Sequence, residues 1–145
     1  MEIINRQASY NYYIDETYET GIVLTGTEIK SIRNGACNLK DSYAIIKNGE
    51  IYLLNTHISP YKQGNIFNHE ETRTRKLLLH KKEILKISNK VNIEGYTLIP
   101  LKIYFKKTKA KLILGVCRGK KNYNKIQVLK EKDLAREMAK NTKFR

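Results

Sequence analysis

The chain of 145 residues contains no tryptophan and only two cysteines, Cys37 and Cys117, which do not form a Cys-x-x-Cys pair. Both cysteines have small or apolar neighbours, and a disulfide is not expected in a cytosolic chain, so we expect buried, unreactive thiols. No apolar run reaches the roughly 18 residues of a transmembrane helix, and we recognise no leader peptide at Met1 to Asn5. These absences predict a soluble, cytoplasmic protein that does not insert into a membrane.

Motifs for catalysis and for metal binding are also missing. The three histidines, His57, His69 and His80, are too widely spaced for the usual helical or hairpin metal pairs. The sequence has no His-Glu-x-x-His, no Gly-x-Ser-x-Gly and no calcium loop. The segment Gly115 to Lys121 is one residue short of a phosphate loop and has lysine where that loop needs serine or threonine. We therefore expect a protein that is not an enzyme and that holds neither a metal nor a cofactor.

Acidic residues are scarce relative to basic ones. Lys and Arg total 28 against 14 Asp and Glu, which gives a net charge of +14 and a pI near 9.8. The last 28 residues contain ten basic and three acidic residues, so their net charge of +7 is half of the total. Such a chain is attracted to polyanions, largely through counterion release. An anionic membrane surface is the competing polyanion, but nucleic acid is favoured.

The segment Thr25 to Gly35 has the pattern of a short helix. Thr25 and Glu28 have the spacing of a capping box, and Gly35 is a suitable residue to end the helix. With the isoleucines of this helix facing inward, Lys30 and Arg33 remain at the surface. We predict that both are available to bind RNA.

Most of the remaining apolar segments favour strands, and Asn48-Gly49 is a strong hairpin signal between two of them. The expected strands cover residues 14–24, 42–47, 50–55, 96–106 and 111–120. The segment Thr72 to Ile93 is instead predicted to be helical, because Gly95 follows it and its apolar residues recur at a spacing of three to four: Leu78 and Leu85, with Ile84, Ile87 and Val91 as further candidates. In total we expect a mainly β fold with flanking helices (α+β): a small antiparallel OB-like barrel of about six strands with two to three helices.

Two segments are expected to lie outside this barrel. The polar loop Ser59 to Glu71 is either functional or a flexible connector. We place the domain boundary at residues 121 and 122, with a basic tail over 122–145. On a helix, four basic residues of this tail would form one stripe: Lys132, Arg136, Lys140 and Lys143. We predict a tail that is disordered when free and folds on a polyanion, while a solvated extension without a role remains the alternative.

The block RTRKLLLH, residues 73–80, joins basic residues to an apolar anchor. Arg73, Arg75 and Lys76 lie beside three leucines, so they are fixed relative to the core, as residues that contact a phosphate backbone should be. Leu78 itself has the pattern of a core residue. Tyrosines near the N-terminus, such as Tyr12, could stack on unpaired bases or fill the barrel core.

Six blocks in order, NRQASYNYYI, GIVLTGTEIKSIRNG, LKDSYAIIKNGEIYLLN, RTRKLLLHKKEI, GYTLIPLKIYF and GKKNYNK, closely resemble the bacterial small protein B family. These are the transfer-messenger RNA binding proteins of ribosome rescue, and the resemblance covers essentially the whole chain. It implies a non-enzymatic RNA chaperone with an OB-like barrel, and we expect the protein to be a monomer.

The resemblance also implies partners. Such proteins hold the transfer-RNA-like part of transfer-messenger RNA and bring it to ribosomes stalled on broken messages. Elongation factor Tu and alanyl-tRNA synthetase would be met only indirectly, through the RNA. The tail would probe the empty messenger channel next to the decoding centre and become helical there.

Individual positions follow from matching the blocks. The residues that fall where the family contacts its RNA are Asn5, Tyr12, Glu19, Arg73, Arg75, Lys76, Leu78 and His80. To these we add the cations Lys30, Arg33, Lys120 and Lys121. Glu19 fits an RNA site because a carboxylate can accept hydrogens from guanine or cytosine.

The tail departs from the usual family pattern. Tyr123 is followed here by Asn124, Lys125 and Ile126, where relatives carry Asp-Lys-Arg after an aromatic residue or histidine. We expect Tyr123, Asn124 and Lys125 to contact the ribosome together with the basic stripe. The contacts of Asn124 and Ile126 are the ones that this departure affects.

Two other functions fit the composition without the resemblance. A ribosomal structural protein would also be small and basic. A sequence-tolerant single-strand binder would depend on aromatic residues spread over one sheet face, whereas here the basic groups are predicted on helices and turns.

Overall fold

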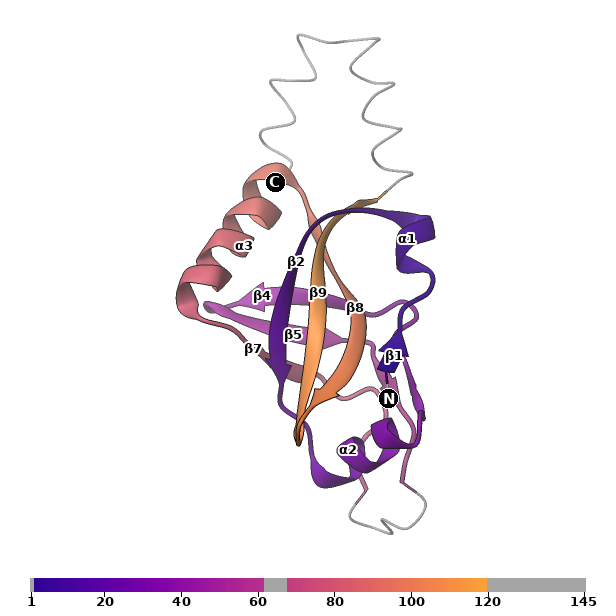
Figure 1. Ribbon diagram of the computed structural model, residues 1–145. Helices are drawn as coiled ribbons and strands as arrows, with labels where there is room; N and C mark the ends of the chain where they lie inside the picture. The colour runs from indigo at the N-terminus through magenta and orange to yellow at the C-terminus, as the bar shows by residue number, and fades with distance from the viewer. Residues whose placement is uncertain (1, 62–67, 120–145) are drawn as a thin grey trace, which may run out of the picture.

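The computed structural model of the protein describes residues 2–61 and 68–119. The elements in chain order are β1 (Glu2–Ile4), α1 (Ala8–Asn11), β2 (Tyr12–Ile22), α2 (Gly26–Arg33), β3 (Cys37–Asn38), β4 (Tyr43–Lys47), β5 (Glu50–Leu54), β6 (His57–Ile58), β7 (Arg75–Leu78), α3 (Lys81–Glu94), β8 (Thr97–Lys106) and β9 (Lys109–Gly119). Figure 1 shows β2, β9 and β8 side by side across the molecule, with α3 on one flank and α2 at the end opposite α1.

Six strands close into a ring. The main sheet has the order β1-β8-β4-β5-β7-β2-β9, and an additional pairing of β8 with β9 joins its two sides. Every pairing is antiparallel, β1 adds to β8 outside the ring, and β3 and β6 form a separate small sheet. The predicted mainly β fold with flanking helices is confirmed, and the ring has the expected six strands. The short strands β1, β3, β6 and β7 were not predicted.

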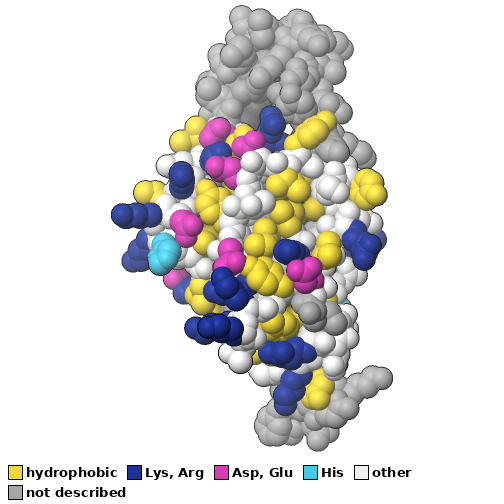
Figure 2. Space-filling model, viewed as in Figure 1, with side chains coloured by type: hydrophobic (Ala, Val, Ile, Leu, Met, Phe, Trp, Pro, Cys, Tyr) yellow, Lys and Arg dark blue, Asp and Glu magenta, His cyan; other side chains and the backbone are white. Residues whose placement is uncertain are grey.

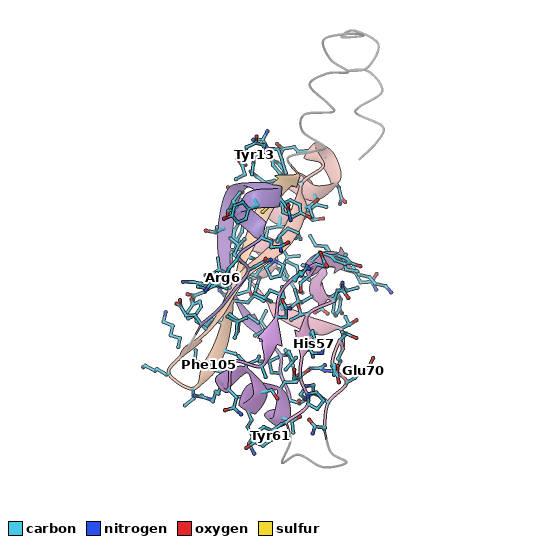
Figure 3. All side chains as sticks on the ribbon, turned by 90° about the vertical axis from the view of Figure 1, so that its right-hand side faces the viewer. Arg6, Tyr13, His57, Tyr61, Glu70 and Phe105 are labelled. Atoms are coloured by element: carbon cyan, nitrogen blue, oxygen red, sulfur yellow. The ribbon has the colours of Figure 1, made fainter. Side chains whose placement is uncertain are left out.

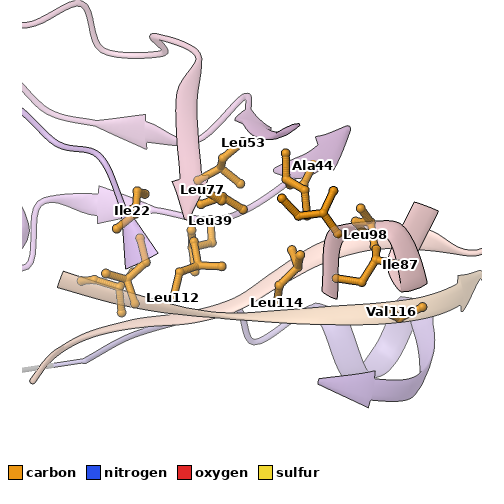
Figure 4. Packing of buried hydrophobic residues seen from close by; sticks show 14 of the residues in the cluster. Ile22, Leu39, Ala44, Leu53, Leu77, Ile87, Leu98, Leu112, Leu114 and Val116 are labelled. Atoms are coloured by element: carbon orange, nitrogen blue, oxygen red, sulfur yellow. The ribbon is translucent and has the colours of Figure 1, made fainter. Parts of the chain in front are cut away.

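Alternating apolar side chains fill the interior of the ring. Leu112, Leu114 and Val116 of β9 point inward, and they meet Ile51 and Leu53 from β5 on the opposite side. All five are fully buried. Figure 4 shows Leu53, Leu112, Leu114 and Val116 in this interior. Burial of one such side chain stabilises the fold by about 1.5–3 kcal/mol, so this interior is the main source of stability and holds the outer faces of the strands in place.

The segment Thr72 to Ile93 is not one helix: the prediction was wrong for residues 75–78, whereas α3 (Lys81–Glu94) is helical and ends at Gly95 as predicted. Residues 75–78 form β7, which pairs with both β5 and β2 and thereby completes the ring. Burial in β7 alternates along the chain: Leu77 is 1% exposed, whereas Leu78 is 51% exposed. Three consecutive leucines are compatible with the periodicity of a helix and with that of a strand. The segment forms a strand because β5 and β2, which are distant in sequence, pair with it. The expectation that Leu78 and Leu85 face the core fails, since Leu85 is 64% exposed, whereas Ile84 and Ile87 of the same predicted series are buried.

Local signals at the ends of elements were interpreted correctly. The Thr25 hydroxyl accepts a hydrogen bond from the Glu28 amide (3.3 Å), and the Glu28 carboxylate accepts one from the Thr25 amide (2.8 Å), which completes the capping box. Asn48 and Gly49 have φ of 54° and 77°. These positive values are the reason why Asn-Gly is favoured in this turn.

Both cysteines are free: Cys117 is buried and Cys37 is partly buried. Burial raises the pKa of the Cys37 thiol to about 12 and that of Cys117 to about 11. Within residues 2–61 and 68–119, no group of three His, Cys, Asp or Glu side chains is placed to hold a metal ion. No helix in these ranges is long and apolar enough to cross a membrane.

Candidate nucleic-acid interface

The outer face of β2, β9 and β8 carries a central group of apolar side chains with Lys and Arg around it (Figure 2). The basic side chains gather toward the end of the molecule that holds α2 and the β8–β9 turn. Such a mixture of apolar area and positive charge is suited to RNA, because bases offer flat apolar faces and phosphates offer negative charge.

Asn5 and Tyr12 line one hollow at the end of the molecule near α1. Its volume is about 270 Å³, and Gln7, Asp41 and Tyr43 contribute to its wall. The Asn5 side-chain amide donates to the carbonyl of Pro100 (2.9 Å), which joins the end of β1 to β8. The structure thus brings these two predicted site residues together.

Glu19 lies on the outer face of β2, in register with Ile113 of β9. Its carboxylate accepts a hydrogen bond from the Tyr104 hydroxyl, and the Lys106 ammonium lies 4.0 Å away. The hydrogen bond from Tyr104 is the main reason why the pKa of Glu19 is lowered, and the same bond raises the pKa of Tyr104 to about 12. Glu19 is therefore an ionised acceptor, exposed on the sheet face.

Lys30 and Arg33 lie at the C-terminal end of α2, and both are exposed as predicted. Each cation is positioned over an aromatic ring. The Lys30 ammonium is 5.4 Å from the centroid of Tyr61, and the Arg33 guanidinium carbon is 4.2 Å from the centroid of Phe105. Figure 3 shows both rings at the α2 end of the molecule.

Arg73 and Arg75 converge on a single buried carboxylate, that of Glu28. Arg73 donates to both Glu28 oxygens (2.7 and 3.2 Å), and the Arg75 Nε–H donates to one of them (2.6 Å). The other nitrogens of Arg75 donate to backbone carbonyls, including that of Thr56 (2.8 Å). Glu28 thus ties α2 to the start of β7.

Arg75 was predicted to contact phosphate, and its position argues against this. The side chain is 0% exposed, and its guanidinium already has a carboxylate and four carbonyl contacts. The role that this geometry supports is structural. Arg73 is different, because 34% of its side chain is exposed beside the same carboxylate.

Burial and hydrogen bonding have opposite effects on the pKa values of Glu28 and Arg75. Burial by itself raises the pKa of Glu28, but the hydrogen bonds from Arg73, from the Thr25 amide and from Arg75 together lower it below the ordinary value. Burial also lowers the pKa of Arg75, which the interaction with Glu28 partly offsets. Glu28 and Arg75 are both charged in the folded protein, because each charge is stabilised by its hydrogen bond to the other.

The remaining predicted residues of this block lie along β7 and at the start of α3. Lys76 forms an ion pair with Glu50 of β5 (2.7 Å), while the exposed Leu78 packs against Gly21 of β2. A Cβ at Gly21 would lie 3.2 Å from the Leu78 Cβ, so this close approach favours glycine. His80 is exposed at the N-cap of α3, where its side chain makes no capping hydrogen bond.

The loop between β6 and β7 is anchored beside α2. The Tyr61 amide donates to the Asn68 side chain (2.8 Å), and the Asn68 amide group donates to the Tyr61 carbonyl (2.6 Å). His69 then contacts the Thr27 hydroxyl (2.9 Å) and the Ile58 carbonyl (2.8 Å). These contacts hold Tyr61 where Lys30 can lie over its ring.

Sequence reasoning missed three residues of this site. Glu28 was recognised only as part of a cap, and Tyr104 and Phe105 only as strand residues. Their partners lie 45 to 85 positions away in sequence, so no local pattern could have revealed them. The predicted residues Lys120, Lys121 and the whole tail lie outside the described residues.

Comparisons with known proteins place this geometry in context. The family model described as SmpB protein matches residues 2–144. SsrA-binding proteins of Staphylococcus aureus strains Newman and COL are each 57% identical over 141 residues, which covers 97% of this chain and 92% of the relative. A chain of a solved structure described as "tmRNA-SmpB: a journey to the center of the bacterial ribosome" superposes with a TM-score of 0.70 at 48% identity, covering 82% of this chain and 84% of that one.

Proposed function

The chain belongs to the SmpB family, and from that premise we propose that it binds the transfer-RNA-like domain of transfer-messenger RNA and delivers this RNA to stalled ribosomes. The observation that carries the proposal is the 57% identity to SsrA-binding proteins over 97% of the chain. A match of this extent includes the ring, both candidate RNA-contacting ends and the basic tail. The partners are accordingly transfer-messenger RNA and the ribosome.

The exposed cations supply the general attraction to RNA. Lys30, Arg33 and the partly exposed Arg73 surround the α2 end, and each phosphate that a cation neutralises releases counterions. Lys76 adds a further charge on β7, although it must share that charge with Glu50. This set gives affinity and orientation, but it carries no information on base sequence.

Selectivity requires groups that contact bases. The ionised carboxylate of Glu19 can accept hydrogens from the edge of guanine or cytosine, and Tyr104 holds it in position. Asn5 and Tyr12 offer an amide and a ring in the hollow near α1. We propose that the same folded RNA contacts Glu19 and this hollow, which lie on opposite stretches of β2.

The protein acts by binding and not by catalysis in this proposal, and it works in the cytoplasm, where ribosomes are. We keep two predictions for the part of the chain outside the described residues. Lys120 and Lys121 contact the RNA, and the tail over 122–145 enters the messenger channel of the ribosome. The high positive charge of these residues supports both.

A reconstituted translation reaction tests the function. Ribosomes are stalled on a message without a stop codon, and alanine-charged transfer-messenger RNA is added with or without the protein. We expect the tag peptide to appear only when both are present. Tagging that is equally efficient without the protein would contradict the proposal. Retention of the protein on salt-washed small subunits, with no effect on tagging, would instead indicate a ribosomal structural protein.

A further inference from the structure

The outward end of α2 meets the turn between β8 and β9. Ile29 and Arg33 are four residues apart, so they share one face of the helix. Ile29 and Ala110 line the same hollow, and Ala110 is the cross-strand partner of Phe105. Arg33 in turn lies over the Phe105 ring, with its guanidinium carbon 4.2 Å from the centroid. This face of α2 therefore looks toward the β8–β9 hairpin across the hollow, and Arg33 reaches the hairpin at Phe105.

Phe105 is a fixed support for this guanidinium. Its ring is partly buried and packs against the hydrophobic core, next to the pairing of β8 with β9. The side chain of Arg33 is exposed, and among the described residues no carboxylate forms an ion pair with it. The guanidinium therefore lies over the ring, and the Arg33 side chain is otherwise open to solvent. An arginine held over a ring in this way has already lost much of the freedom that binding would otherwise restrict.

Further cations surround this stacked pair. Lys106 and Lys109 face each other across the last rung of the hairpin, and Lys107 occupies its turn with a φ of 60°. All three are exposed, and within residues 2–61 and 68–119 only Lys106 forms an ion pair, with Glu19 at 4.0 Å. Together with Arg33, these lysines give four positive charges, one at the end of α2 and three at the tip of the β8–β9 hairpin. Figure 2 shows Lys and Arg side chains gathered at this end.

We infer that Arg33, supported by Phe105, is a stacking platform for one unpaired RNA base, and that the lysines of the β8–β9 turn bind the phosphates beside that base. A nucleobase stacks well on a guanidinium plane, and an aromatic ring on each side of the cation stabilises it through cation–π attraction. The lysines cannot form a stack, so they provide only charge. This inference rests on the proposed function and adds to it the kind of nucleotide that this end of the protein recognises.

Stacking by Arg33 and phosphate binding by the lysines can be separated by substitution, because the first needs a planar group and the second needs only charge. Arg33→Lys keeps the charge but removes the planar group, and Phe105→Leu keeps an apolar residue in the core but removes the ring beneath the arginine. Lys109→Gln is the matched control, because it removes one charge from the same cluster and leaves the stack intact. Thermal unfolding of each variant confirms that it is folded before binding is measured.

The probe is the acceptor fragment of transfer-messenger RNA, with 2-aminopurine at each unpaired purine in turn, since stacking quenches its fluorescence. For the wild-type protein we expect quenching at one such position. With Arg33→Lys and Phe105→Leu this quenching is lost and affinity falls about tenfold, within the range of one base stack, while the salt dependence is unchanged. Lys109→Gln keeps the quenching and lowers the slope of log affinity against log salt by about one.

A second arm uses small ribosomal subunits, to which the same variants are bound and pelleted. A defect of Arg33→Lys confined to the subunits supports the platform and assigns the base to ribosomal RNA, whereas a defect with the fragment assigns it to transfer-messenger RNA. If Arg33→Lys matches the wild type in both arms, the inference is overturned. Failure of the wild-type protein to bind the fragment at all would instead contradict the proposed function.

Discussion

The buried carboxylate of Glu28 allows a quantitative prediction, because the substitution Glu28→Gln removes one charge and changes the shape of the side chain little. The wild-type carboxylate is 0% exposed and accepts hydrogen bonds from the Thr25 amide and from Arg73 and Arg75. In the variant the guanidinium of Arg75 stays buried without a counter-ion, and the new amide directs its own hydrogens at arginine donors. Breaking a buried ion pair in this way costs about 3–5 kcal/mol.

This loss is large relative to the stability of a domain of this size, which is about 5–15 kcal/mol. At about 4 °C for each kcal/mol, the unfolding midpoint should fall by about 12–20 °C. Urea unfolding followed by circular dichroism measures the change in free energy directly. The matched control is Glu50→Gln, which also removes a carboxylate paired with a β7 cation, Lys76 at 2.7 Å. Because 42% of the Glu50 side chain is exposed, its loss should have little effect.

The pH dependence gives a second readout of the same carboxylate. The pKa of Glu28 is lower in the folded protein than its ordinary value of 4.5, so its ionised form stabilises the fold above that pH. This contribution is lost as the pH falls below about 4.5 toward the lower pKa of the folded state. The free energy of unfolding of Glu28→Gln should therefore fall less steeply over this acid range than that of the wild type. Equal losses in Glu28→Gln and Glu50→Gln would refute the reasoning.

Three further predictions concern RNA binding, the tail and the thiols. Arg75→Met should leave the slope of log affinity against log salt unchanged, because the Arg75 charge is already paired and buried. Lys76→Ala should lower that slope by up to one unit. A lower slope for Arg75→Met at neutral pH would show that Arg75 contacts phosphate after all. Truncation after Lys121 should keep binding to the acceptor fragment within about tenfold and abolish peptide tagging, and equal loss of both activities would contradict separate roles for the two parts. Because burial raises the pKa of Cys37 to about 12 and of Cys117 to about 11, a thiol reagent at pH 8 should react slowly with the native protein and rapidly in urea, and fast native labelling would argue against this burial.

Local patterns in the sequence were sufficient for the ends of several elements. The capping box of Thr25 and Glu28 and the turn at Asn48 and Gly49 each depend on residues within four positions of one another, so the chain specifies them without its distant parts. The strand β7 did not follow from such patterns. Its identity depends on the pairing of Leu77 with Ile51 and with Ile22, which lie 26 and 55 positions away.

In the candidate site, too, the features that depend on neighbouring residues could be predicted and those that depend on distant residues could not. The exposure of Lys30 and Arg33 could be deduced from one helix, and the structure agrees. Arg75 shows the limit, since a basic block does not indicate which of its charges has a buried partner elsewhere. The stacking of Arg33 on Phe105 joins positions 72 apart, and only the closed ring brings these two residues together.

The most direct test of the account is a salt titration of binding to the acceptor fragment of transfer-messenger RNA, with intact transfer RNA and poly-U as competitors. We predict that the protein prefers the fragment at every salt concentration, and that affinity falls with salt as expected for contacts from several exposed cations. Equal affinity for all three RNAs would contradict the account, because it would leave a general polyanion binder in which Glu19 and the hollow near α1 have no part in selecting the RNA.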